Sequence, residues 1–467
     1  MTDGTAASGV ASPVGVDTSV ALKKRVRGWM MFDFASQPYN TLLLTFIFGP
    51  YFATVVGDPV AAQSMWGFAI GLAGLAIAVA APVLGALADA SGRHLAWIWF
   101  FSLLYVIGAA ALWFAVPGAE GVLLILAAFC IGLVGMESAT IFTNAMLPTL
   151  GPRDEIGRIS GSGWALGYVG GVLALVVMLL FFAENAAGVT LLGIAPLLGL
   201  DPETREGTRF VGPFAALWYA VFMVPFFLWV RPVRTARQAL PLSRALRTLA
   251  DTLKKLPRTP GFSAYLGASM LYRDALNGLY TFGGIYTVGV LGWSVIDVGV
   301  FGILAAVTGA IFAWAGGRAD RARGPKPVII FCVITLLVVT CLVVTVSPRS
   351  VLGLPVPEGS ALPTIAFYVI GAVIGAAGGA LQASSRTMLV RQANPARITE
   401  GFGLYALAGK ATAFLAPMLI GWVTLVSGSQ QLGILPIAGL FIAGLILLAW
   451  VKPEGEHAAW SAQPSSA

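Results

Sequence analysis

Long apolar runs separated by short polar segments dominate the pattern of residues along this chain. Each run holds about twenty or more residues with few or no charges, which is the length that an α-helix needs to cross a bilayer. The pattern therefore predicts twelve membrane-spanning helices. They fall at approximately 29–56, 64–87, 95–116, 122–147, 160–183, 211–230, 262–289, 297–317, 328–346, 362–389, 401–426 and 432–451.

Composition agrees with this interpretation and excludes an ordinary soluble domain. Of 467 residues, 58% are hydrophobic and 10% are charged, whereas soluble domains carry about 25% charged residues. The three cysteines lie inside apolar runs and are expected to be packing residues. Two histidines are too few for a metal site, so we expect neither a metal nor another cofactor, and no nucleic-acid partner.

The 28 basic residues predict the orientation of the chain. Arg205, Arg209 and Arg349 are the ones that a twelve-span topology places in loops opposite the N-terminus. Arg273, Arg386 and Lys410 lie within spans, and the other 22 lie on the side of the N-terminus. Because basic loops remain cytoplasmic, we expect both termini in the cytoplasm. Arginine outnumbers lysine, a bias that favours a bacterial source and the inner membrane.

The chain is predicted to divide into two six-helix bundles with tails and a linker. These are a disordered tail at 1–28, a bundle at 29–230, a basic linker at 231–261, a bundle at 262–451 and a second tail at 452–467. Leucines at helical spacing in the linker predict an amphipathic helix suited to the membrane surface. A solvated connector remains the alternative.

Three landmarks recur at nearly constant distance in the sequence. Asp33 corresponds to Asp274 and Asp89 to Asp320, while "NAMLP" at 144–148 corresponds to "RTMLV" at 386–390. Such recurrence indicates that six spans were duplicated. Two parallel six-helix repeats around a central site are typical of transporters that alternate access.

The stretch "GALADASGR" at 85–93 resembles the signature loop between the second and third helices of the major facilitator superfamily. The resemblance implies a twelve-helix fold of two pseudo-repeats. It also implies a cytoplasmic gate, here Gly85, Asp89 and Arg93, with Asp320 and Arg321 in the second copy. The sequence departs from the fuller pattern, because Ala90 stands where a basic residue is common.

A narrower resemblance covers nearly the whole chain. "GWMMFDFASQPYNT", "LYRDALNGLYTFGGIY" and "LQASSRTMLV" are similar to the branch containing the autophagy-related vacuolar effluxers and their bacterial relatives. Fungal members of that branch are associated with export of neutral amino acids from the vacuole. The resemblance implies a transporter and not an enzyme.

Polar side chains within spans are the candidate functional residues, since a charged residue at the centre of a lone helix costs about 2.5–3.5 kcal/mol. Asp33, Gln37 and Asn40 share one helical face. Residues expected to line a central cavity are Asp33, Gln37, Asn40, Glu137, Asn144, Asn277, Tyr280, Gln382 and Lys410. The glycine clusters at 167–171 and 375–379 are expected to be close-packing faces.

Glu137 and Lys410 lie deepest in their spans and belong to opposite repeats. A desolvated Glu137 could accept a proton, so Glu137 and Asp274 are the candidate coupling residues. Lys410 could bind a carboxylate cargo or pair with Glu137 in a vacant site. The alternative for Asp33 and Asp274 is a structural pairing with basic residues at the cytoplasmic rim, and Arg386 is expected to be a rim or gate contact.

These features predict a secondary active transporter of a small polar solute, an amino acid or related metabolite. We expect proton coupling, export and a monomer in the lipid bilayer. Two alternatives remain open at this point. One is efflux of amphiphilic drugs or lipids, and the other is a non-transporting receptor or assembly factor on a transporter scaffold.

Overall fold

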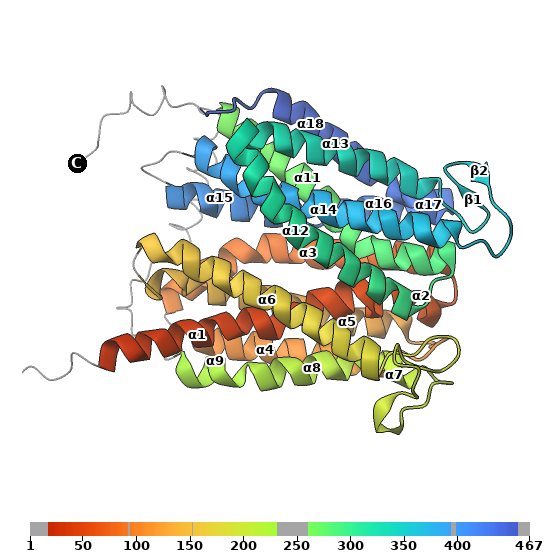
Figure 1. Cartoon of the computed structure of the whole chain (residues 1–467). Helices are drawn as coiled ribbons and strands as arrows, with labels where there is room; N and C mark the ends of the chain where they lie inside the picture. The colour runs from red at the N-terminus through yellow and green to blue at the C-terminus, as the bar shows by residue number, and fades with distance from the viewer. Residues whose placement is uncertain (1–16, 92–93, 152, 231–259, 394–397, 456–467) are drawn as a thin grey trace, which may run out of the picture.

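The computed structural model describes residues 17–91, 94–151, 153–230, 260–393 and 398–455, which form a bundle of long helices running roughly side by side (Figure 1). The helices are α1 Asp17–Pro38, η1 Tyr39–Phe46, α2 Phe48–Val56, α3 Pro59–Ser91, α4 His94–Ala111, η2 Leu112–Phe114, α5 Val122–Ala145, η3 Leu147–Thr149, α6 Arg153–Phe181, η4 Leu197–Gly199, α7 Glu206–Arg209, α8 Val211–Phe222, α9 Val224–Trp229, α11 Pro260–Leu291, α12 Val295–Arg323, α13 Pro325–Val344, α14 Leu362–Gln392, α15 Ile398–Ala411, α16 Leu415–Ser427, α17 Gln430–Ile434 and α18 Pro436–Ala449. The strands β1 Ser350–Val351 and β2 Leu354–Pro355 form a short antiparallel hairpin.

Every apolar run of the sequence is helical in the structure, which confirms the predicted all-α membrane fold. Ten of the described helices are long and apolar enough to cross a membrane. The segment Ala21–Phe46 together with Phe48–Val56, bent by 43°, gives an eleventh crossing. Helix α11 matches the remaining predicted span. Its 32 residues make it about 48 Å long at 1.5 Å per residue, but it carries Arg273, Asp274 and Asn277 in its middle and is not among those ten.

The first helix begins earlier than the sequence predicted. Residues 17–28 belong to α1, so the prediction of a disordered tail through residue 28 is wrong for them. This stretch contains Ala, Leu, Lys and Arg, which favour helix and extend the helix of the first span. Asp33 consequently lies well inside its helix and not one turn from its start. The linker residues 231–259, with the predicted amphipathic helix, lie outside the described residues.

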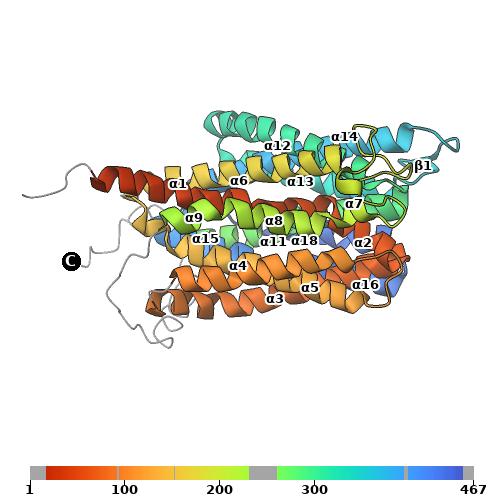
Figure 2. The same cartoon turned by 90° about the horizontal axis from the view of Figure 1, so that it is seen from below.

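The helices fall into two groups that meet along the middle of the molecule. The N-terminal group (α1 to α9) and the C-terminal group (α11 to α18) lie in the lower and upper halves of Figure 1. Equivalent helices pack in equivalent ways: α1 contacts α6, α8 and α9, and α11 contacts α15, α16 and α18. Viewed from below, α4 and α8 of the N-terminal group stand in front (Figure 2). This correspondence agrees with a duplicated six-helix unit.

Helix α1 begins and α18 ends at the same end of the bundle, on the left of Figure 1. We call this the proximal end and the opposite end, where the β1–β2 hairpin lies, the distal end. Both described chain ends lie at the proximal end (Figure 1), which agrees with an even number of crossings.

The two glycine clusters pack helices closely, as predicted. A side chain on Gly170 of α6 would collide with the backbone carbonyl oxygen of Phe34 in α1. A side chain on Gly379 of α14 would collide with the backbone of Gly309 in α12. Small residues at such crossings let two backbones approach and gain van der Waals contact, which is a main driving force for helix association in lipid.

The distal loop between α6 and α8 is held by a buried carboxylate. Glu184 is fully buried, accepts a hydrogen bond from the Thr208 hydroxyl at 2.9 Å and lies 3.2 Å from the Arg205 guanidinium nitrogen Nε. Burial raises the pKa of the Glu184 carboxyl above its ordinary value, and Arg205 and Thr208 act against this shift. The folded loop therefore favours the protonated acid relative to the unfolded chain.

This shift predicts a pH dependence of stability. A raised pKa in the folded state means that the contribution of Glu184 is fully present below the ordinary carboxyl pKa and is lost as the pH rises through the folded-state pKa. We therefore expect Glu184→Gln, which is neutral throughout, to gain thermal stability relative to the parent protein as the pH rises from 4 to 7.5. Melting temperatures of both proteins over this range measure the difference. A constant difference would contradict the assignment.

Candidate functional site

The central feature between the two helix groups is an ion pair. The ammonium nitrogen Nζ of Lys410, on α15, donates a hydrogen bond to Oε2 of Glu137, on α5. The Glu137 side chain is 19% exposed and that of Lys410 is 46% exposed, so the pair lies in a region that solvent reaches. The two deepest charges of the sequence, one from each repeat, thus contact each other.

A break in the eleventh span places Lys410 at this position. Helix α15 ends at Ala411 and α16 begins at Leu415, with a turn between them. Pro417 stands in the first turn of α16, where its missing N–H is tolerated. The first N–H groups of α16 consequently have no partner inside their own helix.

Asp274 of α11 supplies one of those partners. Its oxygen Oδ2 accepts a hydrogen bond of 3.0 Å from the backbone N–H of Ala416, and the side chain is 3% exposed. A carboxylate at this position caps the helix and gains from the positive end of the helix dipole. Among the described residues Asp274 is thus hydrogen-bonded to the start of a helix. This corrects the alternative, considered from the sequence, that Asp274 pairs with a basic residue at the cytoplasmic rim.

This cap predicts a stability loss on substitution. Asp274→Leu would leave the N–H of Ala416 buried without an acceptor, so we expect a loss of about 1–2 kcal/mol in the free energy of unfolding. Asp274→Asn keeps an acceptor oxygen and should lose less. Thermal unfolding of the purified variants measures both. Equal stability of Asp274→Leu and the parent would contradict the capping role.

The polar residues of the first span divide between two neighbours. Asp33 and Gln37 lie against the glycine face of α6, where side chains added at Gly163 and Gly171 would collide with them. Asn40 instead points towards α5, with its amide nitrogen 4.0 Å from the sulfur of Met136. The prediction that these residues share one helical face is therefore correct for Asp33 and Gln37. Asn40 departs from it because the helix widens into the π-helix η1 at Tyr39.

The remaining cavity candidates have different surroundings. Asn277 of α11 and Asn144 of α5 are exposed, and Gln382 of α14 is half-buried. Helix α11, which carries Asn277, packs against helices of both groups. Tyr280, half-buried, lines a small apolar cavity of about 20 Å³ together with Phe46 and Phe301. It lies close to α14, since a side chain at Gly378 would collide with its hydroxyl.

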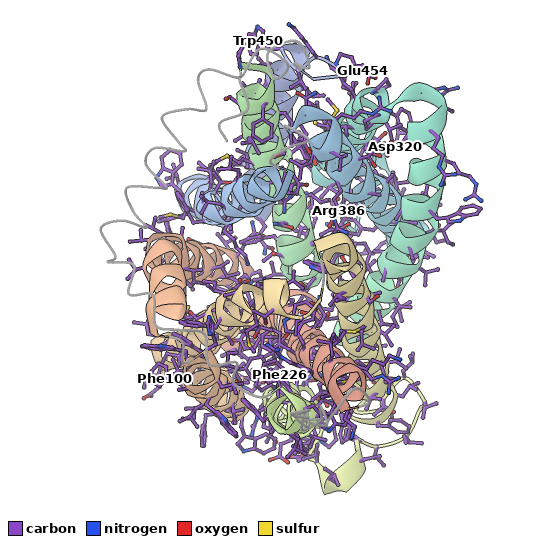
Figure 3. The ribbon with its side chains drawn as sticks, turned by 90° about the vertical axis from the view of Figure 1, so that its left-hand side faces the viewer. Phe100, Phe226, Asp320, Arg386, Trp450 and Glu454 are labelled. Carbon is purple, nitrogen blue, oxygen red and sulfur yellow. The ribbon has the colours of Figure 1, made fainter. Side chains whose placement is uncertain are left out.

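Aromatic residues lie beside the polar ones at the boundary between the groups. The Arg386 guanidinium carbon lies 5.7 Å from the ring centre of Trp164 on α6, and Figure 3, the view from the proximal end, places Arg386 next to that helix. Trp164 and Tyr168 are each 49% exposed. Arg273 packs over Tyr405 at 4.2 Å. Arg386 of the C-terminal group thus approaches an aromatic ring of the N-terminal group.

The distal end of the boundary is closed by a polar cluster that the sequence analysis missed. Gln63 of α3 donates hydrogen bonds to the Thr424 hydroxyl at 2.9 Å and to the Gln430 backbone carbonyl at 3.1 Å. The Gln430 amide donates back to Gln63 at 3.1 Å, and the Ser64 hydroxyl donates to the Gly421 carbonyl. We call Gln63, Ser64, Thr424 and Gln430 the distal clasp. All four are nearly inaccessible to solvent.

The predicted gate residues are only partly described. Gly85 and Asp89 belong to α3, but the Asp89 side chain and Arg93 lie outside what the structure describes. In the second copy, Asp320 is buried and accepts a hydrogen bond of 2.7 Å from the Ser384 hydroxyl of α14. Arg321 is exposed. Asp320 is therefore bound inside the C-terminal group in this conformation.

Comparisons with known proteins agree with the arrangement just described. Residues 49–458 match the family described as "Vacuole effluxer Atg22 like". The chain belongs to this family. The sequence resemblance to that branch is thereby confirmed, as is the expectation of a transporter and not an enzyme.

Relatives are similar over most of the chain but at low identity. The uncharacterized MFS-type transporter YxiO of Bacillus subtilis is 23% identical over 438 residues, covering 92% of this chain and 95% of that protein. Autophagy-related protein 22-1 of Neosartorya fischeri is 24% identical over 311 residues, or 62% of this chain and 46% of that protein. The chain thus spans about half the length of this fungal relative.

Solved structures show the same fold. A crystal structure of the nucleoside transporter NupG superimposes with a TM-score of 0.61 at 15% identity, covering 92% of this chain and 98% of that one. A D-xylose-proton symporter gives a TM-score of 0.59 at 14% identity, covering 94% and 98%. At these identities the likeness establishes the major facilitator fold of an integral, multi-pass membrane protein. It does not identify the transported solute, which has to be inferred from the residues of the site.

Proposed function

We propose that this member of the Atg22-like family is a proton-coupled secondary transporter that exports a small zwitterionic solute, an amino acid or a related metabolite. The observation that carries the proposal is the ion pair between Glu137 and Lys410. It joins an acid of one repeat to a base of the other, at the boundary where alternating access requires the two groups to separate.

An amino acid could replace this pair without leaving either charge alone. Its carboxylate suits the Lys410 ammonium and its ammonium suits Glu137, so binding would exchange one ion pair for two. Breaking an ion pair costs free energy unless both charges regain partners, and a solute with a single charge would leave one of them unmatched. We propose that Asn40 and Asn277 provide polar surface along the same path.

Protonation of Glu137 is the proposed coupling step. A proton on this carboxyl removes its negative charge, so Glu137 can no longer pair with the solute ammonium and the solute is released; loss of the proton lets Glu137 pair again with Lys410 or with the next solute. The partial exposure of both side chains gives a proton access to the pair. Asp274 is a secondary coupling candidate, because its protonation would weaken the cap on α16, which follows the helix that carries Lys410 after a short turn.

We further propose that the proximal end is cytoplasmic and that the protein works as a monomer in a bacterial inner membrane. The excess of basic residues on the side of the termini supports this orientation. With the distal clasp formed, the central pair would then be reached from the cytoplasm, which is the side from which an exporter loads. The gate residues predicted from the sequence, Asp89, Arg93 and Asp320, are the proposed gate of that entrance.

A second candidate function is efflux of amphiphilic solutes. The half-exposed rings of Trp164 and Tyr168 beside the Arg386 cation favour it, because aromatic surface binds apolar bodies and organic cations. Thermal-shift measurements on the purified protein against amino acids, nucleosides and lipophilic cations separate the two, since a bound solute stabilises by mass action. Stabilisation confined to lipophilic cations would overturn the amino-acid proposal.

Transport in proteoliposomes tests the coupling residue. With Glu137→Gln, flux driven by a pH gradient should disappear, while exchange of labelled for unlabelled solute should continue because exchange needs no net proton movement. The exposed Glu358, which pairs with Arg349 in the loop between α13 and α14, offers the matched control Glu358→Gln. Unchanged pH-driven flux in Glu137→Gln would show that Glu137 is not the coupling site.

A further inference from the structure

A cavity of about 580 Å³ opens at the proximal end of the C-terminal group, away from the central pair. It lies between the turn that joins α12 to α13, the end of α14 and the segment after α18. Figure 3 shows Glu454, one of its lining residues, at this end of the molecule. The cavity falls within the size range of small-molecule sites.

The polar side of the cavity is strongly basic. Arg323, Lys326 and Arg391 line it, against the single acid Glu454. Arg391 is held by Glu454 at 2.7 Å, and Lys326 donates to the neutral backbone carbonyl of Val451 at 2.7 Å. Among the described residues no carboxylate is recorded in an ion pair with Arg323 or Lys326. The cavity therefore keeps an excess of positive charge and suits an anion.

The other side of the cavity is apolar and open. Ile330, Phe331 and Ile334 line it along α13, with Phe331 70% exposed and Ile334 46% exposed. These residues belong to a helix that is apolar enough to span the membrane, so they face the hydrocarbon of the bilayer. A soluble anion would use the basic side alone, whereas a lipid would use both.

We propose that this cavity binds the phosphate headgroup of an anionic phospholipid from the leaflet at the proximal end. Basic pockets at the membrane surface attract such lipids with about 1 kcal/mol for each basic residue. The phosphate would lie between Arg323 and Lys326, and an acyl chain would lie along Phe331 and Ile334. Glu454 competes for Arg391, so it weakens the site.

Native mass spectrometry of the delipidated full-length protein tests the site with phosphatidylglycerol and phosphatidylcholine of identical chains. The parent protein should bind phosphatidylglycerol tighter, and the double variant Arg323→Gln/Lys326→Gln should lose about 30-fold in affinity for it, two charges at about fivefold each. Arg318→Gln is the matched control, because Arg318 lies on the same helix but stacks on Trp314 and does not line the cavity. It should bind like the parent.

Glu454→Gln provides a test that does not depend on loss of function. Removing the competing acid should tighten phosphatidylglycerol binding by about fivefold, a gain that misfolding cannot produce. Equal affinity of the parent for both lipids, or no gain with Glu454→Gln, would overturn the proposal. Inorganic phosphate at constant ionic strength distinguishes the source of the anion: displacement of phosphatidylglycerol by millimolar phosphate would assign the cavity to a soluble anion and overturn the lipid assignment.

Discussion

Lys410→Met is expected to reduce solute transport by about 30- to 100-fold, the equivalent of about 2–3 kcal/mol for loss of one partner of a hydrogen-bonded charge pair. The substitution keeps the length and apolar stem of the side chain but leaves Glu137 without its partner and removes the proposed carboxylate ligand. Because the two side chains are 46% and 19% exposed, the accompanying loss in stability should be smaller, about 1–2 kcal/mol. Uptake into proteoliposomes and thermal unfolding measure the two effects.

The double variant Glu137→Gln/Lys410→Met separates transport from stability. Removing both charges should restore most of the lost stability, since a neutral pair leaves no uncompensated charge, while transport stays low. Lys452→Met, at an exposed lysine beyond α18, is the matched control and should transport normally. Normal transport by Lys410→Met would refute a role of the central pair in solute binding.

Gly67→Leu is expected to open the distal end of the molecule. A side chain at Gly67 of α3 would lie 2.7 Å from the Gly421 Cα and from the Pro417 carbonyl oxygen of α16, distances at which backbone atoms must separate. Gln63, Ser64 and Thr424 of the distal clasp lie about one turn away on the same two helices, so the clasp should then break. A cysteine placed at Ser64, which is 3% exposed, should react at least about tenfold faster with a membrane-impermeant maleimide, because exposure of the thiol limits the reaction.

The control for this experiment is Gly439→Leu in α18. A side chain there meets no atom within 4 Å, so the same gain in volume should leave labelling of the Ser64→Cys position unchanged. Both variants are compared in a chain whose native cysteines, Cys130, Cys332 and Cys341, are replaced by alanine. Labelling that does not differ between Gly67→Leu and Gly439→Leu would show that this crossing does not control access from the distal end.

The central pair, the broken eleventh span and the distal clasp belong to one connected structure. Lys410 lies at the end of α15, Asp274 caps the start of α16, and Thr424 near the other end of α16 belongs to the distal clasp. A movement of α16 would therefore change the clasp and the surroundings of Lys410 together. This connection is the physical basis for expecting solute binding in the centre to affect closure at the distal end.

Most of the fold follows from the sequence, because the bilayer leaves few possibilities. Backbone groups in hydrocarbon must be paired within the segment, so an apolar run of about twenty residues becomes a helix, and each of the twelve runs did. The helix boundaries were less accurate where the signal was polar. Residues 17–28 carry helix-forming but charged side chains, so apolarity alone did not include them in α1.

The sequence by itself determined which residues place a charge inside the membrane at a cost in free energy, since Glu137, Asp274 and Lys410 are charged residues within apolar runs. Only the tertiary structure decided what each one meets. Glu137 and Lys410 are 273 positions apart and pair because the two repeats face each other. Asp274 caps a helix that exists only because α15 and α16 are separate, and the distal clasp joins uncharged residues that no run of apolar sequence distinguishes. Hydrophobic periodicity is a local property and fixes helices, whereas the partners of a polar group depend on how distant helices pack.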